Sequence, residues 1–337
     1  MSKYLLSETS NTTGFSSVTQ VNSFLRCQHQ WYLKYVKKIS PKFDSSYFSI
    51  GNACHKAMEA VVSYYGAYGT VALGEGFRAI TRYFESFAVQ YENQEISYEQ
   101  SEQAKEDLST ANEVFLRCID NFNLTDYEIV KVGKQLAVEL HFRLPFKFHG
   151  FIDCIATNKI TGCTWLIDWK FQSSLTDEDK VQYSYQQLVY AIASKYLKKD
   201  ISGIMQVQVL NKPYTKPKLN KDGSASRAKI FNTWNNYRKF LAENNLNPDD
   251  YEQEMVPKLA EVESYRELTE FVNPMQAELL EQELINTYKQ MKQIKKHYPK
   301  SISMIQCPSC PYNILCQAEL NGQDTENIIK IQYEVKQ

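Results

Sequence analysis

The chain has 337 residues, of which 43% are hydrophobic and 23% are charged, so it can bury a core and is not a disordered polymer. Its 38 Lys and Arg residues are balanced by 39 Asp and Glu residues, which gives a net charge of -1. This balance excludes a uniformly basic nucleic-acid binder, and any basic surface must be local.

Targeting signals and membrane spans are absent from the sequence pattern. No run of 18 apolar residues occurs, and the first residues lack a basic segment followed by a long apolar one. We therefore expect a cytoplasmic protein that makes no contact with a membrane. In a reducing compartment, clustered cysteines favour metal ligation over disulfide bonds.

The first 122 residues carry the periodicity of helices. Residues 16–37 predict a helix in which Ser17 and Gln20 form a capping box. Apolar residues at helical spacing predict a second helix over 50–65. Residues 75–122 predict two more helices, separated by the acidic stretch around 95–107.

From residue 134 the pattern changes to that of strands. Apolar and polar residues alternate strictly over 136–144, which is typical of a half-buried strand. Two further strands are expected around 147–156 and 163–171, joined by a turn over 157–162 as a hairpin.

A helix over 178–197 and a strand over 203–210 complete this region. The order of elements predicts the α/β (α+β) class, with a mixed central sheet flanked by helices. Residues 212–229 hold six Lys or Arg against one Asp, which predicts a mobile basic loop that either follows phosphates or is a solvated linker. The remainder to 298 is expected to be helical, including an amphipathic stretch over 274–297.

Polar residues interrupt the two central strands. Asp168 and Lys170 stand two apart, so both project from one face, and we expect them at an edge of the sheet. A solvent-exposed face with an ordinary salt bridge would look the same. Asp153 lies 15 residues earlier across the expected turn, and His55 follows Gly51 on a helix that could cap the same edge.

The next helix carries Tyr183, Gln186 and Tyr190 along one face. Together, the set resembles the PD-(D/E)XK nuclease superfamily, and specifically its RecB-like exonuclease branch, as in CRISPR-associated and AddB-type nuclease domains. The stretches that carry the resemblance are GNACH (51–55), GFID (150–153), IDWK (167–170) and QQLVY (186–190).

The resemblance implies a restriction-endonuclease-like fold and a role for each matching residue. His55, Asp153 and Asp168 would bind the divalent metal, and Lys170 would polarise the attacking water. Gln186 would hold the lysine and the DNA, while Glu139 and Tyr190 are weaker matches to further catalytic positions. The chemistry agrees, because carboxylates suit Mg²⁺, an imidazole favours Mn²⁺, and either ion activates water.

A second group of chemically specific residues is the C-terminal run Cys307, Cys310 and Cys316, spaced C-x₂-C-x₅-C. Three cysteines leave a tetrahedral site incomplete, so a fourth ligand must come from elsewhere. The same resemblance implies Cys27 as that ligand and a [4Fe-4S] cluster that fastens the two ends of the chain together. A zinc site is the alternative, and we expect the other four cysteines to be small buried residues: Cys54, Cys118, Cys154 and Cys163.

The expected function is a DNA exonuclease that uses Mn²⁺ or Mg²⁺ on DNA ends, with single-stranded DNA preferred. Repair, recombination, CRISPR and phage DNA processing are the settings that the resemblance implies, with a helicase or recombination protein as a partner. An endonuclease or flap nuclease, or a non-catalytic DNA-end-binding adaptor, are the alternatives. The expected segments are a helical segment 1–66, a helical arm 67–133, the nuclease core 134–210, a basic loop with a helical insertion 211–299, and the cluster segment 300–337.

Overall fold

The computed structural model describes nine parts of the chain, which are residues 15–42, 46–93, 96–132, 137–141, 147–177, 192, 200–260, 263–294 and 297–335. At its centre is a mixed sheet in the order β3-β6-β7-β8-β9. These strands are β3 (Tyr127–Val132), β6 (Cys154–Asn158), β7 (Thr164–Gln172), β8 (Gly203–Leu210) and β9 (Tyr265–Phe271). β7 and β8 run parallel, and the other neighbours are antiparallel. The predicted class, a mixed sheet flanked by helices, is confirmed.

The predicted hairpin exists, with boundaries that differ from the prediction. β6 and β7 pair antiparallel, and their turn is closed by the Asn158 side chain, which accepts the backbone N–H of Ile160 and Thr161. Gly162 ends the turn with φ = 71°, a conformation that a side chain disfavours. The expected strand over 147–156 is instead broken at residues 152–153 into β5 (Lys147–Phe151) and β6.

Two smaller sheets lie outside the central one. β5 is the middle strand of a three-stranded sheet, between β1 (Phe15–Ser17), which is parallel to it, and β4 (Ala137–His141), which is antiparallel. β2 (Ile39–Pro41) pairs with β10 (Tyr333–Val335), so the C-terminal end of the chain adds a strand to the N-terminal region. A short 3₁₀ turn, η2 (Leu124–Asp126), leads into β3.

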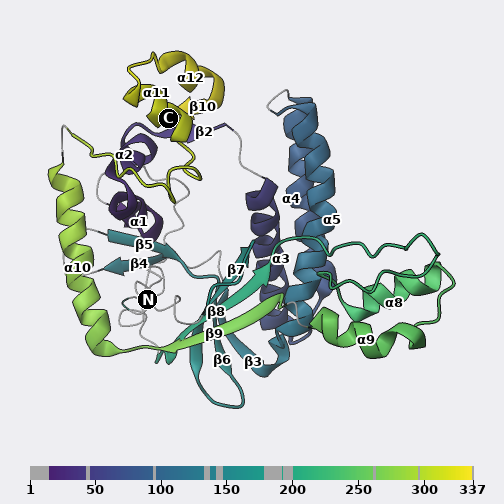
Figure 1. The fold of residues 1–337 in the computed structure, drawn as a ribbon. Helices are drawn as coiled ribbons and strands as arrows, with labels where there is room; N and C mark the ends of the chain where they lie inside the picture. Colours follow the sequence, from purple (N-terminus) through teal and green to yellow (C-terminus); the bar gives the residue numbers. More distant parts are fainter. Residues whose placement is uncertain are drawn as a thin grey trace.

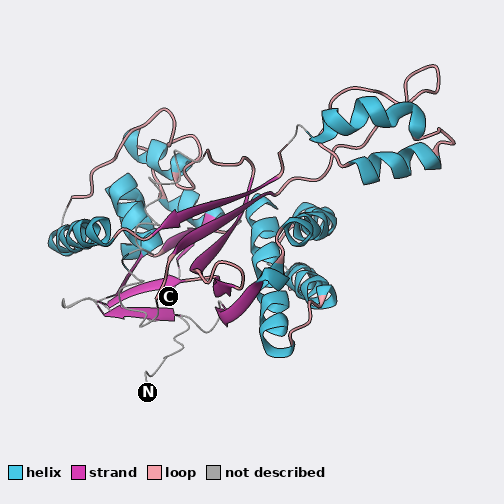
Figure 2. Cartoon of the chain, turned by 90° about the horizontal axis from the view of Figure 1, so that it is seen from below, coloured by secondary structure: helices cyan, strands magenta, loops and turns pink. Residues whose placement is uncertain are grey.

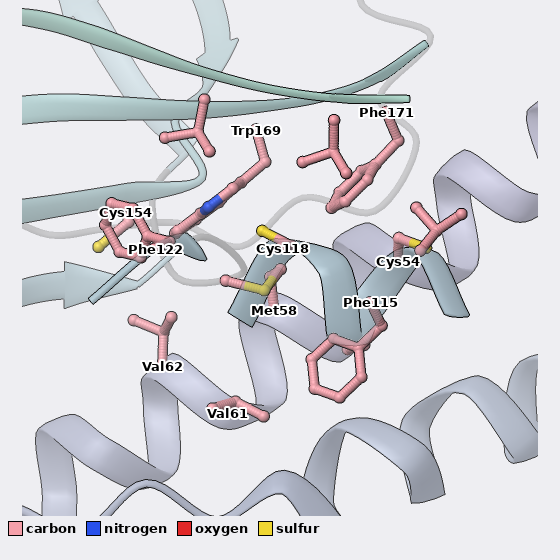
Figure 3. Packing of buried hydrophobic residues seen from close by; sticks show 14 of the residues in the cluster. Cys54, Met58, Val61, Val62, Phe115, Cys118, Phe122, Cys154, Trp169 and Phe171 are labelled. Atoms are coloured by element: carbon pink, nitrogen blue, oxygen red, sulfur yellow. The ribbon is translucent and has the colours of Figure 1, made fainter. Parts of the chain in front are cut away.

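Three long helices cover one face of the sheet, as Figure 1 shows: α3 (Ser46–Tyr68), α4 (Leu73–Glu92) and α5 (Tyr98–Asn121). α5 begins at a capping box in which Ser97 and Gln100 exchange hydrogen bonds, so the acidic stretch expected to separate two helices is mostly helical. Trp169 and Phe171 of β7 pack against this layer beside Met58 and Phe115 (Figure 3). This cluster is the largest hydrophobic core among the described residues.

Two glycines of α4 allow a matched test of this packing. A Cβ atom on Gly76 would overlap the buried ring of Phe115 on α5, whereas a Cβ on Gly74 would meet only Arg78 at 3.5 Å. We expect Gly76→Ala to lower the free energy of unfolding by about 1–3 kcal/mol through overpacking. Gly74→Ala should raise it by up to about 1 kcal/mol, the gain in helix propensity. Urea denaturation of both variants measures the difference, and equal effects would contradict this packing.

The other face of the sheet is covered by N-terminal and C-terminal elements. The predicted helix over 16–37 is interrupted at Cys27 into α1 (Val18–Arg26), α2 (Gln28–Trp31) and the π-helical turn η1 (Tyr32–Val36). The predicted cap is present, since Ser17 Oγ accepts the N–H of Gln20. α1 and α10 (Pro274–Gln293) pack with Leu166 and Ile204 of the sheet in a second core.

The segment between β8 and β9 forms a small helical unit of its own, with α8 (Trp234–Glu243) and α9 (Asp249–Ala260). It extends away from the rest of the chain in Figures 1 and 2. The expectation that this region is helical to 298 is wrong at β9, whose charged, poorly alternating sequence gives little strand signal. The C-terminal segment adds α11 (Asn313–Leu320) and α12 (Glu326–Gln332). Among the helices of the described parts, none is both long and apolar enough to cross a membrane.

Candidate active site

Asp168 and Lys170 lie on β7, the third of the five strands rather than an edge strand. Their side chains share one face, as the spacing predicted, and Lys170 Nζ lies 3.0 Å from Oδ1 and 2.8 Å from Oδ2 of Asp168. Asp168 is only 3% exposed, although a buried carboxylate is expensive unless it is compensated. This burial excludes the interpretation of an ordinary solvent-exposed salt bridge.

Asp153 lies in the break between β5 and β6, where the chain leaves one sheet and enters the other. Its Oδ2 accepts the backbone N–H of Trp169 at 2.9 Å, which fixes the carboxylate against the strand that carries Asp168. The same oxygen lies 3.4 Å from Nδ1 of His55. From the sequence we expected Asp153 to lie within a strand. It lies instead in the break between β5 and β6, and this position turns its side chain towards β7.

His55 reaches the site from α3, the helix that packs most closely on β7. Its imidazole meets the ring of Phe171 edge-on, with centroids 5.2 Å apart, so that the ring is held between β7 and Asp153. His55, Asp153, Asp168 and Lys170 therefore gather from three separate parts of the sequence. The structure brings together these four predicted site residues.

The pKa values of these residues reflect an excess of negative charge at a largely buried site. Burial raises the pKa of Asp168, and the nearby Asp153 carboxylate raises it further, against the opposing effect of Lys170. Burial by itself would lower the pKa of His55, but the carboxylates of Asp153 and Asp168 outweigh it and the pKa is raised. The site thus attracts positive charge beyond that of Lys170.

The donor set suits a divalent cation in its chemistry. Two carboxylates supply hard oxygen ligands and His55 adds an imidazole nitrogen, the combination that Mg²⁺ or Mn²⁺ accepts. Within the described parts of the chain, no group of three His, Cys, Asp or Glu side chains is arranged to hold a single metal ion. Asp153 is instead paired with His55, and Asp168 with Lys170. A bound cation would replace part of these pairings.

Four other residues singled out from the sequence are placed less fully. Gln186 and Tyr190 lie outside the described residues, as does Tyr183. Glu139 falls on β4 opposite His149 of β5, and its side chain is outside the description.

The structure also reveals two polar neighbours that the sequence interpretation missed. In the parallel register, Gln206 stands beside Asp168 and Gln208 beside Lys170, both buried and joined by a hydrogen bond of 2.6 Å. Gln208 also accepts the N–H of Thr176, which fastens the segment after β7. The signal was present in GIMQVQVL, where two glutamines recur in an otherwise apolar strand.

The four cysteines expected to bind a cluster meet at one place. Cys27 stands at the break between α1 and α2, Cys307 and Cys310 lie in turns, and Cys316 lies in α11. All four line one cavity of about 40 Å³, and all are free thiols. Burial raises the pKa of the Cys310 and Cys316 thiols, and the proximity of Cys27 raises both further.

The remaining cysteines lie elsewhere in the described structure. Cys54, Cys118 and Cys154 are fully buried in the core between the sheet and α3–α5, as predicted, while Cys163 is half-buried beside it. Cys54 therefore lies in a different part of the fold from Cys307, Cys310 and Cys316 and is not placed to bind a metal with them.

The fold and this group of residues define a nuclease of the type in which a central sheet presents two acids and a lysine. The sequence matches the PD-(D/E)XK nuclease superfamily over residues 16–317, and the chain belongs to that superfamily. Its members hydrolyse phosphodiester bonds and generally use divalent metal ions such as Mg²⁺ or Mn²⁺. No curated protein matches the chain in a sequence search.

Proposed function

We propose that the chain is a deoxyribonuclease of the RecB-like type, which degrades DNA from free ends and prefers single strands. The observation that carries the proposal is the pair of the buried Asp168 and the half-buried Lys170 beside Asp153 and His55. A protein that only bound DNA would have no use for two sheltered acids next to a lysine. Placing two acids beside a lysine in this way lowers the stability of the fold, and a role in hydrolysis explains why the arrangement is present.

The proposed reaction adds the oxygen of a water molecule to phosphorus and breaks the bond to the leaving oxygen, which takes up a proton. Asp153 and Asp168, with His55, would hold a Mg²⁺ or Mn²⁺ ion that lowers the pKa of the water and relieves charge on the phosphoryl oxygens. Lys170 would orient the water and place its positive charge beside the phosphoryl group, where charge develops. The backbone N–H of Trp169 and the ring of Phe171 keep Asp153 and His55 oriented.

The experiment that tests this proposal compares linear and closed circular single-stranded DNA, with the linear DNA labelled separately at its 5′ and 3′ ends. An exonuclease releases nucleotides from linear DNA alone, and the end that loses its label first gives the polarity. Cleavage of the circle would identify an endonuclease. A protein that binds both DNAs and degrades neither would be an adaptor.

The metal site leads to a separate prediction. Activity should be lost in excess EDTA, and Mn²⁺ should restore it at least as well as Mg²⁺ because an imidazole is among the ligands. His55→Ala should weaken metal affinity by about 10- to 100-fold and move the preference towards Mg²⁺. Titration of the metal against initial rates measures both effects. Full activity in EDTA would overturn the metal assignment.

We also propose that Cys27, Cys307, Cys310 and Cys316 hold a [4Fe-4S] cluster. Their arrangement around a shared cavity supports it. A cluster is wider than one ion, so its thiolate ligands stand farther apart than those of zinc. The cluster would join the N-terminal helices to the C-terminal segment and leave the hydrolytic chemistry to the other site.

A further inference from the structure

The unit between β8 and β9, residues 211–260 and hereafter the arm, has a construction that the active site does not explain. It has its own small core, formed by Ala225, Tyr237, Leu241, Tyr251, Met255 and Leu259. The basic loop 212–229 is part of this unit, since Ala225 N–H donates to Tyr251 and Tyr237 donates to Ser226 O. The loop is therefore held against the helices of the arm.

The base of the arm is fixed to the body by a buried cation. Arg117 of α5, 2% exposed, donates to the carbonyl oxygens of Leu210 and Lys212. Its guanidinium packs against the rings of Tyr214 and Phe231, at 4.2 and 4.8 Å from their centroids, and the two rings contact each other with centroids 5.2 Å apart. Stacking on two aromatic faces and bonding to two carbonyls restrain the direction in which the arm leaves the sheet.

The arm also begins beside the active site. Gln208 pairs with Lys170, and Asn211, the first residue of the arm, donates its backbone N–H to Gln172 O at 2.9 Å. At about 3.3 Å per residue, the chain from Gln208 to Lys212 spans at most about 13 Å. A DNA strand that crosses the site at Lys170 and leaves past the C-terminal end of β7 therefore passes the base of the arm.

Charge is segregated along the arm. The acids of α9 are Asp249, Asp250, Glu252 and Glu254, and Glu254 pairs with Arg227 and Lys258. In contrast, Lys216, Lys218 and Lys221 are exposed, and no ion pair among the described residues includes them. The only acid in this loop, Asp222, accepts hydrogen bonds from Ser224 N and Oγ within the turn. The basic loop of the arm is thus left with three exposed lysines that no ion pair in the described chain includes.

We propose that the arm is a polynucleotide clamp, in which Lys216, Lys218 and Lys221 bind backbone phosphates several nucleotides away from the bond that is cut. The inference rests on the proposed function and adds to it that the substrate must be long enough to reach the arm. A row of cations on a fixed support binds phosphates without reading the sequence. The clamp would therefore raise affinity for long DNA of any sequence and leave the chemical step unchanged.

The test uses the full chain and its triple variant Lys216→Gln/Lys218→Gln/Lys221→Gln. Fluorescence anisotropy in EDTA, from about 50 to 300 mM salt, measures binding to single strands of about 30 and about 6 nucleotides. If each lysine binds one phosphate, the slope of log K against log salt should fall by about 2 for the long strand, which corresponds to roughly 50-fold in affinity at 0.15 M salt. The short strand should bind both proteins equally, and kcat with metal should be unchanged.

A matched control removes the same charge elsewhere, at the exposed lysines 289, 292 and 330. It should retain the wild-type slope. An unchanged slope in the arm variant, or an equal loss in the control, would overturn the clamp while leaving the nuclease proposal standing. A wild-type protein that neither binds nor cleaves DNA would overturn both. None of the three arm lysine side chains forms a hydrogen bond or ion pair with another described residue, so thermal unfolding of the arm variant should coincide with that of the wild type.

Discussion

Lys170→Met should lower kcat for DNA cleavage by at least about 10³-fold while affinity for DNA changes only a few-fold. Methionine keeps most of the length of the side chain and removes its charge, so the change mainly reports the electrostatic contribution of the ammonium group. The ammonium group is held 2.8–3.0 Å from both oxygens of Asp168, which places its positive charge at the site. Asp153→Asn and Asp168→Asn should reduce kcat comparably, because the metal ligands and the lysine work as one unit.

Stability measurements distinguish this interpretation from a structural ion pair. Asp168→Asn removes a buried carboxylate that lies near a second one, so its free energy of unfolding without metal should be within about 1 kcal/mol of wild type, or higher. Lys289→Met on α10, an exposed lysine, is the control and should keep full activity. Near wild-type cleavage by Lys170→Met, accompanied by a large loss of stability, would show that the pair only supports the fold.

The parts of the fold that the sequence predicted are those governed by neighbouring residues. Alternation placed Asp168 and Lys170 on one face of β7, and Ser17 was recognised as a helix cap because its partner Gln20 is three residues away. β9 escaped prediction because its place in the sheet is set by pairing with β8 across the whole arm. No local pattern marks such a strand when Leu268 is its only buried residue.

The candidate site shows the same division. The residue types and their order along the chain pointed to His55, Asp153, Asp168 and Lys170 through a family resemblance. Their actual meeting depends on the break at residues 152–153 and on the packing of α3 against β7, which are tertiary features. The buried position of Asp168 on a central strand also contradicts the expected sheet edge, because β6 and β8 pair with β7 on its two sides.

The second large effect is expected at Cys27. Protein purified without oxygen should be brown, with broad absorption near about 400 nm, whereas a zinc protein would be colourless. Cys27→Ala and Cys310→Ala should each lose this colour and become sensitive to protease. Cys163→Ala is the matched control, since Cys163 is also half-buried but lies at the β6–β7 turn, and it should remain brown and stable.

The magnitude of the Cys27 effect depends on what else joins the two ends of the chain. Cys27 and Cys307 stand 280 positions apart, and closing so long a loop restricts the unfolded chain strongly, which predicts a loss of about 3 kcal/mol or more. Other contacts also join these regions: the pairing of β2 with β10, and a small core of Leu33, Ile39, Tyr312, Leu315 and Tyr333. We therefore expect Cys27→Ala to open the cavity locally while this core persists, so that limited proteolysis cuts first between residues 299 and 310. Full iron content in a stable Cys27→Ala protein would place the fourth ligand elsewhere.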